Sequence, residues 1–131
     1  MITLKQGAIK GSIIAFMLAV SACTSTVSIA DTISPAELIQ KGQEASDRNK
    51  YKQSLQYYQA IIDRYPSYVD EVCEAEYTIA FIHYKQKKYE LAKTEFNALL
   101  SRYEGADVEL LPLQFKKLSE IVLAKIAAKE K

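Results

Sequence analysis

The chain has 131 residues, of which 49% are hydrophobic, and its 17 Lys and Arg residues against 16 Asp and Glu residues leave a net charge of +1. A near-neutral chain with interspersed charges gives no support to nucleic-acid binding or to electrostatic adhesion to anionic lipid. Its two cysteines exclude a disulfide framework, and its length allows one small domain.

The first 22 residues have the organisation of a secretory signal peptide. Lys5 and Lys10 form a basic region, residues 11–20 form an apolar segment, and small residues lead to Cys23. Because spanning a bilayer takes about 20 apolar residues, the apolar segment is too short for a transmembrane helix. The sequence therefore predicts a leader over residues 1–22 that is removed from the mature chain.

The Val-Ser-Ala-Cys run at 20–23 resembles the lipobox of bacterial lipoproteins. In that family the cysteine carries acyl chains such as palmitate, so the resemblance implies that Cys23 anchors the chain to a membrane. No aspartate follows Cys23 directly, which favours the periplasmic face of the outer membrane over the inner membrane. Two alternatives stay open: cleavage after Ser28–Ala30, which would release a soluble protein, and an uncleaved transmembrane anchor.

A tether and a helix start follow the cysteine. Residues 23–34 are rich in small and hydroxylated side chains and lack helical periodicity, which predicts a flexible tether. Ser34 can cap the first free N–H groups, Pro35 suits the first helical position, and Glu37 completes a capping box. We therefore expect the folded domain to begin with a helix at residue 35.

From residue 35 the pattern is helical, and it repeats at an offset of 38 residues. The matching pairs are Tyr51 with Tyr89, Ser54 with Ala92, Tyr58 with Phe96, Ile61 with Leu99, and Tyr65 with Tyr103. Self-similarity at such a period indicates stacked supersecondary units. Each unit is predicted to contain two helices.

These residues resemble the tetratricopeptide repeat. The resemblance implies an all-α fold, a short right-handed α-solenoid with helix–turn–helix repeats at residues 35–70 and 73–106 and a capping helix after them. Gly42 and Ala80 would let paired helices approach closely, and Tyr58 and Phe96 would fill the space beside them. The period of 38 residues exceeds the 34 residues that are common in the family. In this longer period the repeats are similar to those of the outer-membrane assembly lipoprotein and the Tol-associated coordinator.

The capping helix is predicted over residues 108–128. An apolar stripe runs along it at helical spacing through Leu111, Phe115, Leu118, Val122 and Ile126. A terminal helix of this kind covers the exposed core of the last repeat. Because about three units are normally needed for stability, homodimerisation or partner binding could add to the stability of two repeats.

The sequence contains no arrangement typical of catalysis, so we expect no enzyme activity, no metal site and no cofactor. His83 is the sole histidine, and it lies at a position that the family fills with an aromatic packing residue. We therefore expect its imidazole to be packed in the core rather than to act as a base or a metal ligand. Four acidic residues near one helix start suit the helix dipole: Asp70, Glu71, Glu74 and Glu76.

Two further residues have structural predictions. Gly105 is expected to be the C-cap of the helix that ends near Tyr103. Once Cys23 is lipidated, Cys73 has no intramolecular partner, and we expect a small, partly buried helix residue. Pairing of Cys73 with another molecule is the alternative.

The resemblance also implies a groove that holds segments of partner proteins. Tyr77, Phe81 and Tyr84 share one helix face that differs from the face of Ile79, Ala80 and His83. Two interpretations follow: the stripe is buried against the last helix and the first repeat, or it lines the open groove. The other candidate groove residues are Ile39, Gln43, Asp47 and Lys85.

The sequence thus predicts a lipid-anchored adaptor of a bacterial cell envelope that binds another protein and no nucleic acid. The alternative within this class is a pilotin-like accessory subunit of a secretion or pilus machine. A structural dimer without a client is a third hypothesis. An envelope hydrolase is disfavoured because nucleophile, base and metal ligands are absent from the pattern.

Overall fold

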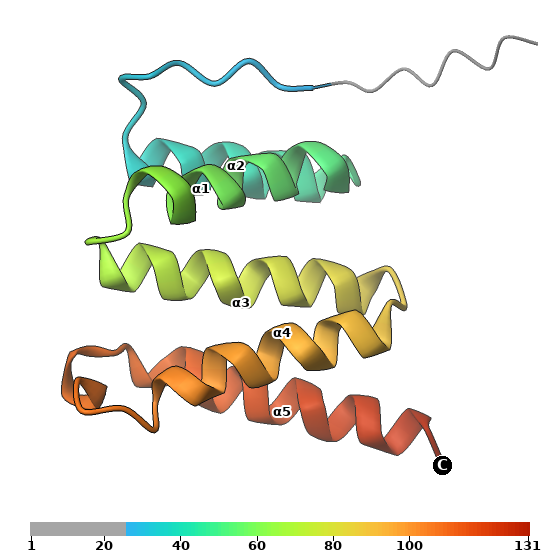
Figure 1. Cartoon of the computed structure of the whole chain (residues 1–131). Coiled ribbons are helices and arrows are strands. Elements are labelled where there is room, and N and C mark those ends of the chain that lie inside the picture. Colours follow the sequence, from blue (N-terminus) through green and yellow to red (C-terminus); the bar gives the residue numbers. More distant parts are fainter. Residues whose placement is uncertain (1–25) are drawn as a thin grey trace, which may run out of the picture.

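The computed structural model describes residues 26–131, so the predicted leader and Cys23 lie outside the described residues. The helices are α1 (Pro35–Asp47), α2 (Tyr51–Arg64), α3 (Val69–Lys85), α4 (Tyr89–Arg102) and α5 (Leu113–Lys129), with a short 3-10 turn, η1 (Val108–Leu110), before α5 (Figure 1). Residues 26–131 contain no strand. The predicted all-α fold is therefore confirmed.

The helices stack in chain order. Each contacts the next, and α1, α3 and α5 also contact one another in series. In Figure 1 the α1–α2 pair and the segment before it form one end of the stack, and α5 forms the other end. Such packing of consecutive helix pairs is that of a short α-solenoid.

The start of α1 is fixed by the predicted capping box. The Glu37 backbone N–H donates to the Ser34 hydroxyl oxygen at 3.3 Å, and the Ser34 backbone N–H donates to a Glu37 carboxylate oxygen at 3.0 Å. Pro35 occupies the first turn, where its missing N–H costs nothing. These bonds lower the pKa of Glu37.

Equivalent residues of the two repeats occupy equivalent places in the core. Tyr58 and Phe96 are both buried, as are Ile61 and Leu99. A Cβ atom added to Gly42 would lie 2.7 Å from the Tyr58 ring, which no ordinary contact tolerates. The predicted close approach at Gly42 is therefore confirmed, and its reason is the ring of Tyr58.

The last helix differs from its prediction in two ways. It begins at Leu113 rather than at residue 108, since Leu111 and Pro112 are extended. Leu118 was expected in the buried stripe but is 40% exposed, and Ser119 is buried in its place. The Ser119 hydroxyl donates to the Phe115 carbonyl at 2.7 Å, which removes the penalty of burying it.

The prediction for Gly105 is wrong. α4 ends with Tyr103 as its C-cap, and no glycine in residues 26–131 has a positive φ. The Gly105 N–H makes a long bond, 3.4 Å, to the Arg102 carbonyl. The chain leaves α4 through a helical cap and an irregular loop, so the left-handed conformation that favours glycine is not used here.

The predicted flexible tether is also wrong for residues 27–33, which we call the N-terminal strap. The strap lies along α2: the Val27 N–H donates to the Gln56 side-chain oxygen at 2.8 Å, and Arg64 donates to the Ala30 carbonyl at 3.0 Å. Ile33 is only 8% exposed and belongs to the core cluster formed with α1, α2 and α3. Val27 and Ile29 point one side of the strap inward, and a turn at residues 31–32 then leads to the buried Ile33, which composition alone did not reveal.

Candidate protein-binding surface

The aromatic stripe of α3 forms a ladder of rings. The Tyr77 and Phe81 centroids are 5.9 Å apart and the Phe81 and Tyr84 centroids are 5.8 Å apart, both in stacked geometry. All three side chains are of intermediate exposure. Residues spaced by three and four positions share a helix face, so this ladder follows directly from the sequence.

The ladder packs against the last two helices. The Tyr77 ring lies 5.7 Å from both Phe96 of α4 and Phe115 of α5, measured between centroids. Tyr84 approaches Tyr89 at 5.9 Å. Burial against the last helix therefore accounts for one edge of the ladder, and the half-exposed remainder is open to solvent. Binding by this surface stays a prediction.

The other candidate groove residues lie on α1 and at the end of α3. Gln43, Asp47 and Lys85 are exposed. Ile39 is half-buried because it packs on the core cluster around Leu38. Three of these four candidate residues are therefore accessible to a partner, whereas the Ile39 side chain points largely into the core.

Lys85 links the two repeats on this side of the stack. Its Nζ lies 5.2 Å from the centroid of the Tyr51 ring, a cation–π distance. Tyr51 begins α2, so the contact joins the end of the second repeat's first helix to the start of the first repeat's second helix. Lys85 remains exposed and can also meet an anionic group of a partner.

Burial perturbs two ionisable groups between the repeats. Burial raises the pKa of Tyr58 to about 12, and the Glu74 carboxylate acts in the same direction. Burial likewise raises the pKa of Glu74, with the Glu71 carboxylate adding to the effect. Because burial is the largest cause of both shifts, we interpret them as consequences of packing.

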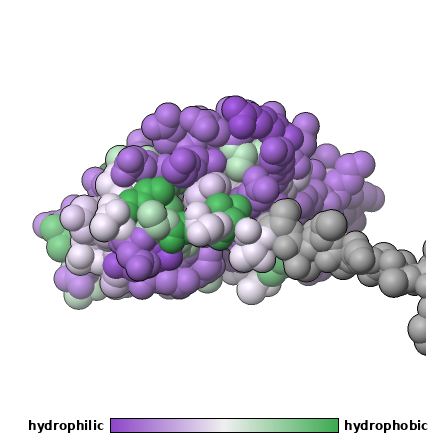
Figure 2. All heavy atoms as spheres, turned by 90° about the horizontal axis from the view of Figure 1, so that it is seen from above, coloured by the Kyte–Doolittle hydropathy of each residue, from purple (hydrophilic) through white to green (hydrophobic). Residues whose placement is uncertain are grey.

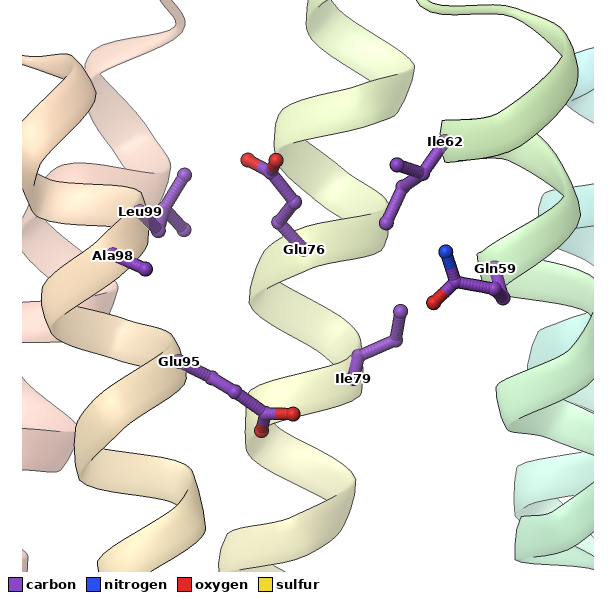
Figure 3. A pocket seen from close by; sticks show the side chains of 7 residues that line it. All are labelled: Gln59, Ile62, Glu76, Ile79, Glu95, Ala98 and Leu99. Atoms are coloured by element: carbon purple, nitrogen blue, oxygen red, sulfur yellow. The ribbon is translucent and has the colours of Figure 1, made fainter.

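Besides the ladder, a cleft lies on α3 between α2 and α4, and the sequence did not predict it. It encloses about 210 Å³ and is lined by Gln59, Ile62, Glu76, Ile79, Glu95, Ala98 and Leu99 (Figure 3). In Figure 3 the side chains of Glu76 and Ile79 rise from the central helix between the other two. Polar and apolar side chains therefore alternate on all three helices that line the cleft.

A salt bridge and a histidine–carboxylate contact join α3 to α4 on this side of the second repeat. Arg102 donates to Glu76 at 2.7 Å, and the Nδ1 atom of His83 lies 2.7 Å from a Glu95 oxygen. His83 was predicted to be a packed imidazole, and its side chain is 12% exposed. Its carboxylate partner was not predicted, because Glu95 lies 12 residues away on the next helix.

Other chemical features of residues 26–131 are limited. Cys73 is fully buried and free, and burial raises the pKa of its thiol, which makes it unreactive. In this range no three His, Cys, Asp or Glu side chains gather as metal ligands would. None of the described helices has both the length and the apolar composition needed to cross a bilayer.

Comparison with known proteins identifies the repeats. Residues 38–68 and 74–106 each match the tetratricopeptide repeat family. A Treponema pallidum (strain Nichols) protein described as uncharacterized is 32% identical over 108 residues. The match covers 80% of this chain and 43% of that protein, so the chain spans less than half of its relative's length. No solved structure is significantly similar to the chain.

Proposed function

We propose that this chain, which contains two tetratricopeptide repeats, is a lipid-anchored adaptor of a bacterial cell envelope that binds a segment of another protein. The repeats themselves indicate protein–protein interaction. The observation that carries the proposal is the half-exposed ladder of Tyr77, Phe81 and Tyr84. Partly open aromatic side chains are the residues that most often anchor protein interfaces.

The ladder suits a partner segment with apolar side chains. Its rings are already ordered by stacking on one another and by the tilted contacts of Tyr77 with Phe96 and Phe115, so binding would cost little side-chain entropy. Of the other proposed groove residues, the exposed Asp47 and Lys85 offer one charge of each sign. The specificity of such a surface would depend on its shape and on the positions of its positive and negative charges rather than on net charge.

Anchoring through Cys23 would place this surface at a membrane. The support is the resemblance of residues 20–23 to a lipobox and the apolar segment before it. Assembly of an envelope or outer-membrane complex is the role that such an anchor and such repeats would serve together. The pilotin-like role remains the alternative hypothesis, and it makes the same demand for a binding surface.

Site-specific photocrosslinking in cells tests the adaptor function. A photoreactive residue placed at Gln43 or at Lys85 should give the same discrete crosslinked species, because the proposed groove includes both exposed positions. The matched control is Asn97, which is equally exposed on α4. Adducts that are identical at all three positions, or no adducts at Gln43 and Lys85, would contradict binding at this surface.

A further inference from the structure

The N-terminal strap is held at both of its ends. Near one end, Val27 is bonded to Gln56, and at the other end the Tyr65 hydroxyl donates to the Ile33 carbonyl. Between them Ile29 packs on the core cluster, and the Arg64 guanidinium binds the Ala30 carbonyl. The strap therefore runs beside α2 from its second turn to its C-terminal end.

The strap shortens the reach between Cys23 and the folded domain. An extended chain spans at most about 3.5 Å per residue. A free tether from Cys23 to Pro35 would cover twelve such steps, roughly 42 Å. With the strap bound, only the four steps from Cys23 to Val27 remain, a reach of at most about 14 Å.

The strap also selects one end of the molecule. It covers the outer side of the α1–α2 pair, whereas α5 closes the opposite end of the stack (Figure 1). Packed helices lie about 8–10 Å apart. The α1–α2 pair and α3 both lie between the strap and α5, so more than about 20 Å separates the strap from α5, which exceeds the reach left to Cys23.

The surface around the strap suits lipid headgroups. Figure 2 looks onto this end of the stack and shows a line of hydrophobic surface bordered by hydrophilic side chains. Exposed Asp63 and Arg64 of α2, which lie beside Val27 and Ile29 of the strap, carry both signs of charge. A surface with both signs of charge has no single-sign field that would require anionic lipid.

From this geometry we infer that the strap orients the domain, with the α1–α2 end against the phospholipid headgroups and α5 turned away from the membrane. The inference rests on the proposed lipidation of Cys23. It goes beyond anchoring because a free tether would hold the protein at the membrane without selecting a face. The aromatic ladder would then stand at the side of the domain, accessible to a membrane-bound or a soluble partner.

The test places a fluorophore near the strap or far from it in the lipidated full-length protein. In a Cys73→Ala background, Asp63→Cys on α2 and Lys117→Cys on α5 provide two exposed attachment sites. The proteins are reconstituted into phosphatidylcholine vesicles that carry a quencher on the headgroup. We expect strong quenching at position 63 and weak quenching at position 117, unchanged by salt.

Two further variants test the strap itself. Ile29→Asp should release the strap and abolish the difference in quenching, whereas Ser28→Asp, its exposed neighbour, should retain it. An inserted Gly-Ser linker of roughly 20 residues before Val27, with an r.m.s. length of about 25 Å, lengthens the reach without touching the fold. It should also abolish the difference.

The outcomes separate the two proposals. Wild-type protein that fails to enter vesicles overturns both the lipid anchor and the orientation. Protein that enters vesicles but shows equal quenching at both sites overturns the orientation alone. A difference that survives both Ile29→Asp and the linker would show that the strap does not set the orientation.

Discussion

Asn49 and Lys87 lie 38 positions apart and share a left-handed backbone, with φ of 57° and 62°. Each ends the turn between the two helices of its repeat. The next N–H, of Lys50 or of Lys88, reaches back to the carbonyl of Ala45 at 2.8 Å or of His83 at 2.9 Å. This is the Schellman arrangement, in which glycine or asparagine is usual at the left-handed position.

Lys87 is therefore a strained residue that glycine should relieve. A residue other than glycine costs about 1–2 kcal/mol in the left-handed region. Glycine avoids this strain, but it loses more backbone entropy on folding, which offsets part of the gain. We expect Lys87→Gly to stabilise the protein by about 0.5–1 kcal/mol in urea unfolding. Lys88→Gly, at a negative φ of -84°, is the control and should not stabilise. A loss of stability in Lys87→Gly would contradict the assigned turn.

Gly42 should tolerate no side chain. A Cβ atom there would meet the buried Tyr58 ring at 2.7 Å, so Gly42→Ala should overpack the α1–α2 contact and destabilise the protein by about 1–3 kcal/mol. Gln43→Ala on the exposed side of the same helix should change the free energy of unfolding by less than about 0.5 kcal/mol. Equal melting temperatures for the two variants would refute the helix contact.

Alkaline pH should destabilise the protein through Tyr58. Burial raises the pKa of Tyr58 to about 12, against about 10 in an unfolded chain. The folded state holds the phenol proton more tightly, so this contribution to stability is complete below about pH 10 and is lost as the pH rises towards 12.

Tyr58→Phe removes this ionisation. Its urea midpoint should fall less than that of the wild type when the pH is raised through the same range. The pKa of Tyr103 is also raised to about 12 by burial, so part of the dependence remains. Tyr68→Phe, at a residue that is 49% exposed, should behave as the wild type does. Parallel curves for Tyr58→Phe and the wild type would contradict the assigned burial.

Phe81 should contribute to stability less than a core residue does. Truncation of a buried Phe costs about 3–5 kcal/mol, and Phe81 is half-buried against the cluster of Ala80, Ala92 and Phe96. We expect Phe81→Ala to cost about half of that amount. Phe96→Ala, at a fully buried ring, should cost the full amount. A loss as large at Phe81 as at Phe96 would retire the binding surface and leave a core residue.

Cys23→Ser tests the lipid anchor. The variant should lack acylation, and its leader should not be cleaved before residue 23. It should no longer partition into detergent as a lipoprotein, because the acyl chains, which contribute about 0.8 kcal/mol per buried CH₂, are missing. Metabolic labelling with a fatty acid measures this directly. Ser21→Thr, which leaves the cysteine in place, is the control. Labelling that survives Cys23→Ser would remove the anchor from the proposed function.

Features that depend on neighbours along the chain were readable from the sequence. The capping box of Ser34 and Glu37 spans one turn, and the pairing of Tyr58 with Gly42 follows from a repeat that the sequence displays twice. Helical periodicity placed Tyr77, Phe81 and Tyr84 on one face in the same way. These relations are fixed by helix geometry, which the spacing of residues expresses directly.

Features that depend on how the helices stack were decided only by the tertiary structure. The exchange of Leu118 for Ser119 on the buried side of α5 depends on which side of α5 packs against α3 and α4. The strap contact between Val27 and Gln56 joins residues 29 positions apart, and its alternating apolar residues are too few to show a period. A segment this short is ordered because α2 offers a complementary surface, and no property of its own sequence shows that surface.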